Sequence, residues 1–160
     1  MKNDLQATNQ KVKQVEKRVE SNEINTRNYN FLIHGVVPND FKNVSCREIL
    51  RQVCQLMACF DAQKLAAIVT KVKKCHYLFG KDKSKRDPSK PTPIIYTMNR
   101  DIERDLVMSN AKHLKDKLLN GRKLYIKCDQ TALQRADCMD AKGIEAKLKA
   151  KFGAENVRLR

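Results

Sequence analysis

The order of the apolar segments after residue 30 restricts this chain to a small number of folds. Residues 31–37 form an apolar run, interrupted by Gly35 and followed by Pro38, which is typical of a buried strand. A helical pattern, two strand-like segments, a second helical pattern and a fourth strand-like segment follow. The order β-α-β-β-α-β predicts the split βαβ arrangement, an α+β sandwich with both helices on one face of a four-stranded sheet. The other face of that sheet is expected to be open.

The limits of the single elements are predicted from apolar periodicity, capping residues and turn residues. Ser45 is expected to cap the first helix in a capping box with Glu48, and Asp61 and Asn99 are expected to cap two later helices. The predicted elements are a strand at 31–37, helices at 46–60 and 62–67, strands at 68–79 and 94–98, a helix at 100–119, a strand at 123–128, a helix at 131–151 and a last strand at 157–159.

Residues 1–28 differ from the rest of the chain because they contain no Gly, Pro or aromatic residue. A heptad register places apolar residues at a and d positions, and these residues are Leu5, Val12, Val15 and Val19. In the same register the flanking pairs Lys11–Glu16 and Arg18–Glu23 carry opposite charges. The segment is therefore expected to form a coiled coil between copies of the chain, and β-branched residues at a and d favour three strands over two. A single exposed helix or a disordered arm is the alternative.

The domain organisation follows from these patterns. Residues 1–28 are expected to be an oligomerisation helix, residues 29–129 a ferredoxin-like domain of RNA-recognition-motif type, and residues 130–160 a short helix–strand extension. RNA-recognition motifs bind through the open face of their sheet, so that face is the expected binding surface here.

The charge balance indicates a polyanionic partner. The chain has 33 Lys and Arg against 18 Asp and Glu, a net charge of +15. A compact domain repels itself at such a charge, which favours RNA or single-stranded DNA, an anionic membrane surface or an acidic protein as partner. No apolar run is long enough to span a bilayer, and the N-terminus lacks a signal peptide. We therefore expect an intracellular protein without membrane insertion.

The positive charge is concentrated in one part of the sequence. The segment 80–93 has three prolines and no apolar residue, so it is expected to be a mobile loop. Together with the strand before it, this loop carries the predicted phosphate-binding cluster of Lys71, Lys73, Lys74, Lys81, Lys83, Lys85, Arg86 and Lys90. Charge that serves solubility alone is the alternative for this cluster.

Signals for catalysis and for metal binding are missing from the sequence. The six cysteines include no C-x-x-C pair, and the adjacent Cys75 and His76 are too few for a metal site. Phosphate-loop, serine-hydrolase and zinc-protease motifs are absent, and the three histidines have no evident catalytic partner. We expect a protein that is not an enzyme and that uses no cofactor or metal.

Aromatic residues for base stacking are few. Alternation in the strand 123–128 points Leu124, Ile126 and Cys128 inward and Tyr125 and Lys127 outward, while Tyr77 and Tyr96 fit either face. The basic-Gly-aromatic octamer of RNA-recognition motifs is absent from PTPIIYTM. Binding dominated by the nucleic-acid backbone is therefore expected.

Four segments together resemble the first-open-reading-frame protein of LINE-type, non-LTR retrotransposons. They read FLIHGV at Phe31–Val36, IIYTMNRDIERDLVMSN and its continuation at Ile94–Leu119, GRKLYIKCD at Gly121–Asp129 and TALQRADCMDAK at Thr131–Lys142. The baculovirus FP protein family is similar in this region. The resemblance implies a homotrimer that coats RNA or single-stranded DNA and acts as a nucleic-acid chaperone. It also implies a location in a cytoplasmic ribonucleoprotein, the nucleus or both. The FP-like alternative is a viral assembly protein that acts through coiled-coil contacts.

The same resemblance implies further contact residues. Six basic side chains match positions expected to neutralise phosphates, with Tyr125 as a stacking platform. They are Arg100, Arg104, Arg122, Lys123, Lys127 and Arg135. Family members usually continue into a longer C-terminal domain than residues 131–160, so the chain is expected to be abbreviated or a fragment.

Overall fold

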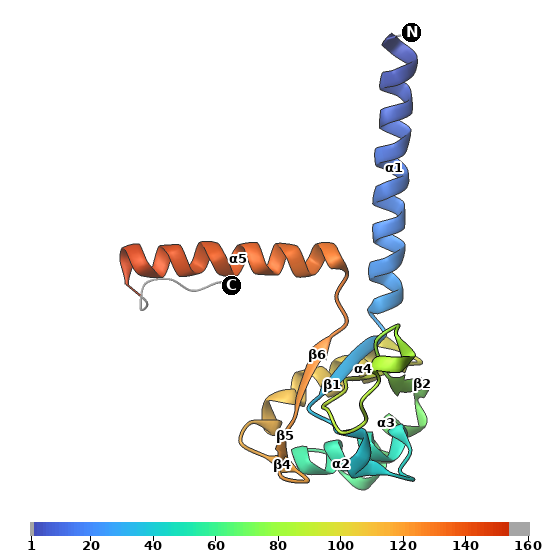
Figure 1. Ribbon diagram of the computed structural model, residues 1–160, viewed down its shortest axis with the longest axis vertical. Helices are drawn as coiled ribbons and strands as arrows, with labels where there is room; N and C mark the ends of the chain where they lie inside the picture. The colour runs from blue at the N-terminus through green and yellow to red at the C-terminus, as the bar shows by residue number, and fades with distance from the viewer. Residues whose placement is uncertain (1, 154–160) are drawn as a thin grey trace. The chain divides into compact units, whose positions relative to one another are not determined.

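A four-stranded antiparallel sheet forms the framework of residues 25–129 (Figure 1). The strand order is β2-β3-β1-β6, and the strands are β1 (Asn30–His34), β2 (Val72–Tyr77), β3 (Ile94–Met98) and β6 (Tyr125–Cys128). The computed structural model describes residues 2–153. The two strands that precede the helical segments, β1 and β3, lie in the centre of the sheet, as the split βαβ order requires.

The core lies between one face of this sheet and the helices. These are α2 (Cys46–Met57), α3 (Ala62–Thr70) and α4 (Asp101–Asn110). The central strands contribute Phe31 and Tyr96, whose rings stack at 5.2 Å, and the Tyr96 hydroxyl donates a hydrogen bond to the Cys46 carbonyl at 2.7 Å. Helix α2 contributes its apolar face, with Ile49 and Val53 fully buried. The α+β sandwich of RNA-recognition-motif type is therefore confirmed.

The helices begin where the sequence places capping side chains. Ser45 caps α2 by accepting the Glu48 amide at 3.2 Å, and Asp61 caps α3 by accepting the Lys64 amide at 2.8 Å. The predicted cap of α4 is wrong, because the N-cap residue is Arg100 and makes no side-chain cap bond. The backbone N–H of Asn99 donates instead to the Lys71 carbonyl at 2.8 Å, which holds Asn99 at the end of the sheet.

The predicted boundary between α3 and β2 is also wrong. The strand was expected from residue 68, but the helix continues to Thr70 and the strand begins at Val72. Ile68 is buried in the core from the helix, three residues after Leu65. Packing of this helical face therefore outweighs the strand preference of the β-branched run Ile-Val-Thr.

The predicted helix 100–119 ends early. Helix α4 stops at Asn110, a 3₁₀ turn follows at η3 (Ala111–Leu114), and β4 (Leu118–Leu119) then pairs with β5 (Arg122–Lys123). The chain reverses because Leu114 is buried against the core and residues Asp116 and Asn120 adopt positive φ angles of 64° and 49°. A further 3₁₀ turn, η1 (Pro38–Phe41), buries Phe41.

The segment 80–93 joins β2 to β3 and contains regular turns, where the sequence indicated only a mobile loop. A 3₁₀ turn, η2, covers Lys83–Lys85. The backbone of the segment is tied to its surroundings by hydrogen bonds from Leu78 to Pro93, from Thr92 to Val36 and from Asn39 to Pro88, at 2.8, 2.8 and 3.0 Å. We call this segment the basic loop.

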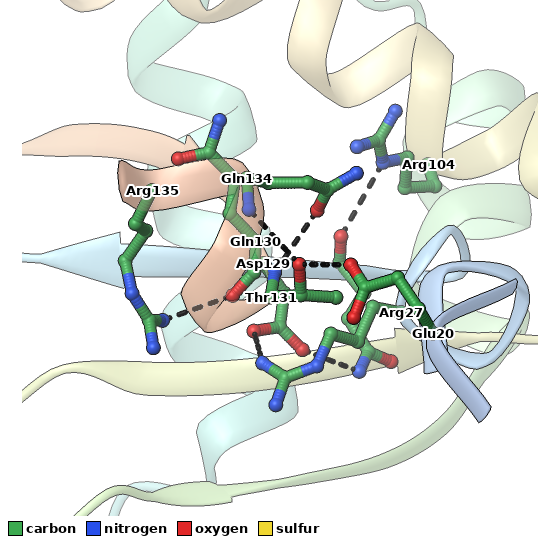
Figure 2. Close-up of polar contacts among 9 residues, drawn as sticks. Glu20, Arg27, Arg104, Asp129, Gln130, Thr131, Gln134 and Arg135 are labelled. Carbon is green, nitrogen blue, oxygen red and sulfur yellow. Dashed lines mark hydrogen bonds and ion pairs between the residues drawn. The ribbon is translucent and has the colours of Figure 1, made fainter. Parts of the chain in front are cut away.

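The second unit combines residues up to 24 with residues from 130 onward. It contains most of α1 (Lys2–Arg27) and all of α5 (Ala132–Phe152). Thr131 and Gln134 form the capping box of α5, and the Thr131 hydroxyl donates to Glu20 at 2.7 Å (Figure 2). The helix predicted at 131–151 is thus confirmed, whereas the strand expected at 157–159 lies outside the described residues. In the described part of the chain, no helix is long and apolar enough to cross a bilayer.

Gly35 lets two segments of the sandwich approach closely. Its φ angle is +96°, and a Cβ atom built there would lie 2.3 Å from the Lys123 carbonyl oxygen. Gly121 has a φ angle of +75°, but a Cβ atom built there would meet no described atom within 4 Å other than those of its chain neighbours. The same holds for Gly80. A side chain would thus cause both overlap and backbone strain at Gly35, backbone strain alone at Gly121, and neither at Gly80.

We expect Gly35→Ala to lower the free energy of unfolding by at least about 2 kcal/mol, because strain and overlap add. Gly121→Ala should cost about 1 kcal/mol from backbone strain alone, and Gly80→Ala, the control, should stay within about 0.5 kcal/mol. Urea unfolding followed by circular dichroism measures all three. Equal stability of the Gly35 and Gly80 variants would show that the close approach to Lys123 is incorrect.

Candidate nucleic-acid interface

The outward face of the sheet is defined by strand register. Phe31, Ile33, Ile94, Tyr96 and Met98 point into the core, so the alternate residues of each strand point away from it. The register places Lys74 beside Thr97 and Asn30, and His76 beside Ile95, Leu32 and Lys127. His34 and Tyr125 face each other in the last row.

The outward side chains of the four strands carry positive charge and include no Asp or Glu. They are Asn30, Leu32, His34, Lys74, His76, Ile95, Thr97, Tyr125 and Lys127. Asp129 follows β6 directly and is bonded to Arg27 and Asn30. Lys74 and Lys127 are exposed on opposite edge strands, β2 and β6. Because no carboxylate on these strands competes for the two ammonium groups, the face attracts anions.

His34 and Tyr125 form an aromatic pair at one end of the face. Their rings stack with centroids 5.2 Å apart and an angle of 7°, and Tyr125 is 50% exposed. The Lys127 ammonium lies 5.4 Å from the centre of the Tyr125 ring, a cation–π contact. The outward orientation predicted for Tyr125 and Lys127 is confirmed, as is the inward orientation of Leu124.

Partial burial lowers the pKa of His34 below its ordinary value of 6.5, and the nearby Lys127 charge lowers it further. His34 is therefore a neutral aromatic ring at pH 7. Neutral His34 stacks on Tyr125 and adds no charge to the two lysines of the face.

The other tyrosines of the sheet are not available for stacking on a ligand. Tyr96 is fully buried, and Tyr77 packs against the core. Burial raises the pKa of Tyr77 to about 12 and raises that of Tyr96 still further. The sequence left the face of both residues open, and the structure places both on the core side.

The basic loop leaves the sheet at the end where the His34–Tyr125 pair lies. Its two halves share the pattern Asp-x-Ser-Lys, at residues 82–85 and 87–90. In each half the Asp accepts hydrogen bonds from the backbone amide and the hydroxyl of the Ser, and these bonds lower the pKa of Asp82 and of Asp87. Each carboxylate is thus hydrogen-bonded to a serine. The ammonium groups of Lys85 and Lys90 lie farther away, at 3.9 Å from Asp82 and 3.8 Å from Asp87.

Cationic side chains of the loop remain accessible. The side chains of Lys85 and Lys90 are 84% and 78% exposed, and Lys81 and Lys83 are exposed as well. Arg86 lies over the Phe79 ring at 5.3 Å, and both line a hollow of about 220 Å³ with Lys85 and Lys90. The loop therefore presents several cations around one small hollow.

Most arginines of the predicted site are engaged within the protein. Arg100 pairs with the buried Glu103 at 2.5 Å, and Arg122 pairs with Asp40 at 3.1 Å. Arg104 pairs with Asp105 at 2.8 Å and donates to the Asn30 carbonyl at 3.3 Å (Figure 2). In the second unit, Arg135 donates to the Gln130 carbonyl at 2.9 Å. Phosphate contacts by these four residues stay a prediction, whereas Lys71, Lys73 and Lys123 are exposed.

A polar hollow that the sequence did not indicate lies at the opposite end of the sheet. Lys73 and Lys74 line it together with Tyr29 and Asn30, and its volume is about 440 Å³. The break in the heptad at residues 28–30 was visible in the sequence, but it marked only the end of a helix. Outward alternation from Phe31 identifies Asn30, yet only the pairing of three strands brings these residues together.

An ion pair joins the two ends of the domain 25–129. Arg27 donates to Asp129 at 2.7 Å (Figure 2). The Asn30 side-chain amide donates to the other Asp129 oxygen at 2.9 Å. Among residues 2–153, no three His, Cys, Asp or Glu side chains lie together in a group that could hold a metal ion.

We expect the pKa of His34 in the free protein to be below 6.5, read from imidazole carbon shifts in an NMR titration. Lys127→Ala should raise this pKa only partly, because burial is the larger cause. The folded chain disfavours protonated His34, so its contribution to stability is present above pH 6.5 and is lost as the pH falls below it. Lys64→Ala on α3 is the control, and a His34 pKa above 6.5 would contradict the assignment.

No protein-family model matches the chain, and no curated protein matches it. Among solved structures, the chain is similar to the Mip6 RRM3 domain, with 9% identity and a TM-score of 0.39 over 65% of this chain and 95% of that one. It is similar to the Pes4 RRM3 structure with 11% identity and a TM-score of 0.37 over 64% and 93%. Neither similarity bears on what this chain binds.

Proposed function

We propose that this protein is a non-enzymatic binder of single-stranded nucleic acid, which it holds mainly through the phosphate backbone. The observation that carries the proposal is the open sheet face, where Lys74 and Lys127 are exposed and no strand residue is acidic. The basic loop leaves one end of this face with further exposed lysines. A strand of phosphates laid across the sheet would meet Lys74 and Lys127 on the edge strands and, at one end, the lysines of the basic loop.

Single-stranded nucleic acid fits the aromatic content of the face better than a duplex does. Tyr125 is half exposed and stacked on neutral His34, so a base can stack on the exposed part of its ring. The central strands offer Leu32, Ile95 and Thr97 instead of aromatic rings. Few bases are therefore held by stacking, and backbone contacts dominate the affinity.

The finer proposal is that the chain packages RNA or single-stranded DNA as a trimeric nucleic-acid chaperone in a retrotransposon-like ribonucleoprotein. Its support is the sequence resemblance together with helix α1, a continuous helix of 26 residues. The expected a and d residues Leu5, Val12, Val15 and Val19 are 67, 49, 56 and 59% exposed in the single chain. Association of several α1 helices would bury this stripe.

The same stripe also favours the second candidate, an FP-like assembly protein that acts through coiled-coil contacts. The two candidates differ in the role of the basic loop, because assembly through α1 alone does not require its cations.

We expect the joint replacement of Lys81, Lys83, Lys85 and Arg86 by Ala to weaken binding to single-stranded RNA and to flatten its salt dependence. The log–log salt slope should fall by about 0.7 for each phosphate that the variant no longer neutralises. Fluorescence anisotropy titrations at increasing salt measure both quantities. Replacing Lys42, Lys64, Lys112 and Lys115 by Ala removes the same charge from exposed sites outside the face. If both quadruple variants behave alike, net charge and not the loop drives binding.

We expect Val12→Lys with Val19→Lys to dissociate the oligomer, because two a positions become charged. Gln10→Lys with Gln14→Lys adds the same charge at outward heptad positions and should leave the mass unchanged. Light scattering after size exclusion gives the molar mass of each variant. A wild-type chain that is monomeric at every concentration would exclude assembly through α1.

A further inference from the structure

We infer that the polar hollow at the end of the sheet is a base-recognition pocket for one nucleotide that carries an exocyclic amino group. The hollow has a volume of about 440 Å³ and is lined by Thr26 at the end of α1, by Tyr29 and Asn30, by Lys73 and Lys74, and by Thr97, Met98 and Asn99. This inference rests on the proposed function, which it deepens from backbone binding to recognition of one base. The volume is within the range of small-molecule sites.

The walls of the pocket are built by strand register and not by mobile side chains alone. A bulge in β2 between Val72 and Lys74 places two successive lysines, Lys73 and Lys74, at the rim. The far wall is held by the backbone hydrogen bond from Met98 to Tyr29, at 2.9 Å. Bulges commonly redirect side chains beside functional sites, and here the bulge adds a second cation without an acidic residue in the lining.

The Asn30 side chain supplies the observation that points to a ligand. Asn30 is only 9% exposed, and its Nδ2 atom donates to Asp129 at 2.9 Å. Its Oδ1 atom is buried and has no hydrogen-bond partner among the described residues. Because Asp129 also accepts from Arg27, it is a carboxylate that requires a donor, which fixes the amide with nitrogen toward Asp129. The oxygen is thereby left as an unfilled acceptor in a residue that lines the pocket.

An unfilled acceptor selects the chemistry of the ligand. Adenine, cytosine and guanine carry amino groups that donate hydrogen bonds, whereas uracil presents oxygen at the position of the cytosine amine. A buried acceptor that meets an amine gains a bond, and one that meets a carbonyl oxygen stays unpaired and is repelled. The pocket therefore discriminates cytosine from uracil, which have the same ring size.

Two further features fit a nucleotide. The Tyr29 ring is 40% exposed at the pocket, which leaves area for a base to stack on it. Lys73 and Lys74 are exposed at the rim, where a 5′ or 3′ phosphate of the bound unit would lie. From the Asn30 row to the His34 row the face extends about 13 Å, so the pocket and Tyr125 accept different nucleotides of one strand.

The test compares labelled 12-nucleotide oligo(C) and oligo(U) RNA with the full chain in anisotropy titrations at fixed salt. We expect oligo(C) to bind about threefold to tenfold more tightly. Tyr29→Leu should weaken oligo(C) binding about tenfold and remove the preference. The double variant Lys73→Ala with Lys74→Ala should weaken binding. The double variant Lys112→Ala with Lys115→Ala removes the same charge elsewhere and should not.

A second measurement does not depend on a folded variant. Cytidine monophosphate added to the ¹⁵N-labelled wild type should shift the amide signals of Tyr29, Lys74 and Asn99, and uridine monophosphate should shift them less. Equal affinity for both oligonucleotides, or shifts confined to other residues, would overturn the pocket while loop-dependent binding kept the proposed function intact. No binding of either oligonucleotide would instead refute the proposed function itself.

Discussion

The structure depends on the burial of one face of a short sheet. Phe31 and Tyr96 stack across the two central strands beneath α2, and the Tyr96 hydroxyl closes onto the first turn of that helix at Cys46. Because side chains alternate along a strand, filling this face with large apolar residues fixes which residues face outward. The cations of Lys74 and Lys127 therefore share one surface as a direct consequence of core packing.

The availability of these cations follows from how acidic groups are placed. The carboxylates near the sheet have other partners: Glu103 holds Arg100, Asp40 holds Arg122, and Asp129 holds Arg27. In the basic loop, two aspartates bond to the following serines. Arginines thus serve largely as structural partners, whereas lysines on strands and loop stay exposed. Nucleic-acid phosphates fit a surface of this kind, because exposed lysines act as point charges without fixed geometry.

The hydrogen bonds from Arg27 and Asn30 to Asp129 connect the two ends of the domain 25–129 beside the proposed pocket. One carboxylate accepts from a guanidinium and from an amide, so it orients Asn30 while it ties the last helical turn of α1 to the end of β6. The Asn30 Nδ2 atom is held by Asp129, and its Oδ1 atom has no partner among the described residues. In the proposed pocket this oxygen accepts from the base. Removal of Asp129 would leave the Asn30 amide free to rotate and would remove both the hydrogen bond and the orientation of this oxygen.

The sequence by itself determined the order of the elements, the caps at Ser45 and Asp61, the outward side of Tyr125 and the concentration of charge in residues 71–90, because periodicity, capping chemistry and composition are local properties. Tertiary structure decided the rest. Ile68 is helical because its side chain is buried in the core from α3. The second half of the helix expected at 100–119 is instead a 3₁₀ turn and a hairpin, because Leu114 is buried. The pocket, too, joins residues from three strands and a helix end, and no local pattern encodes which distant partners their register will bring together.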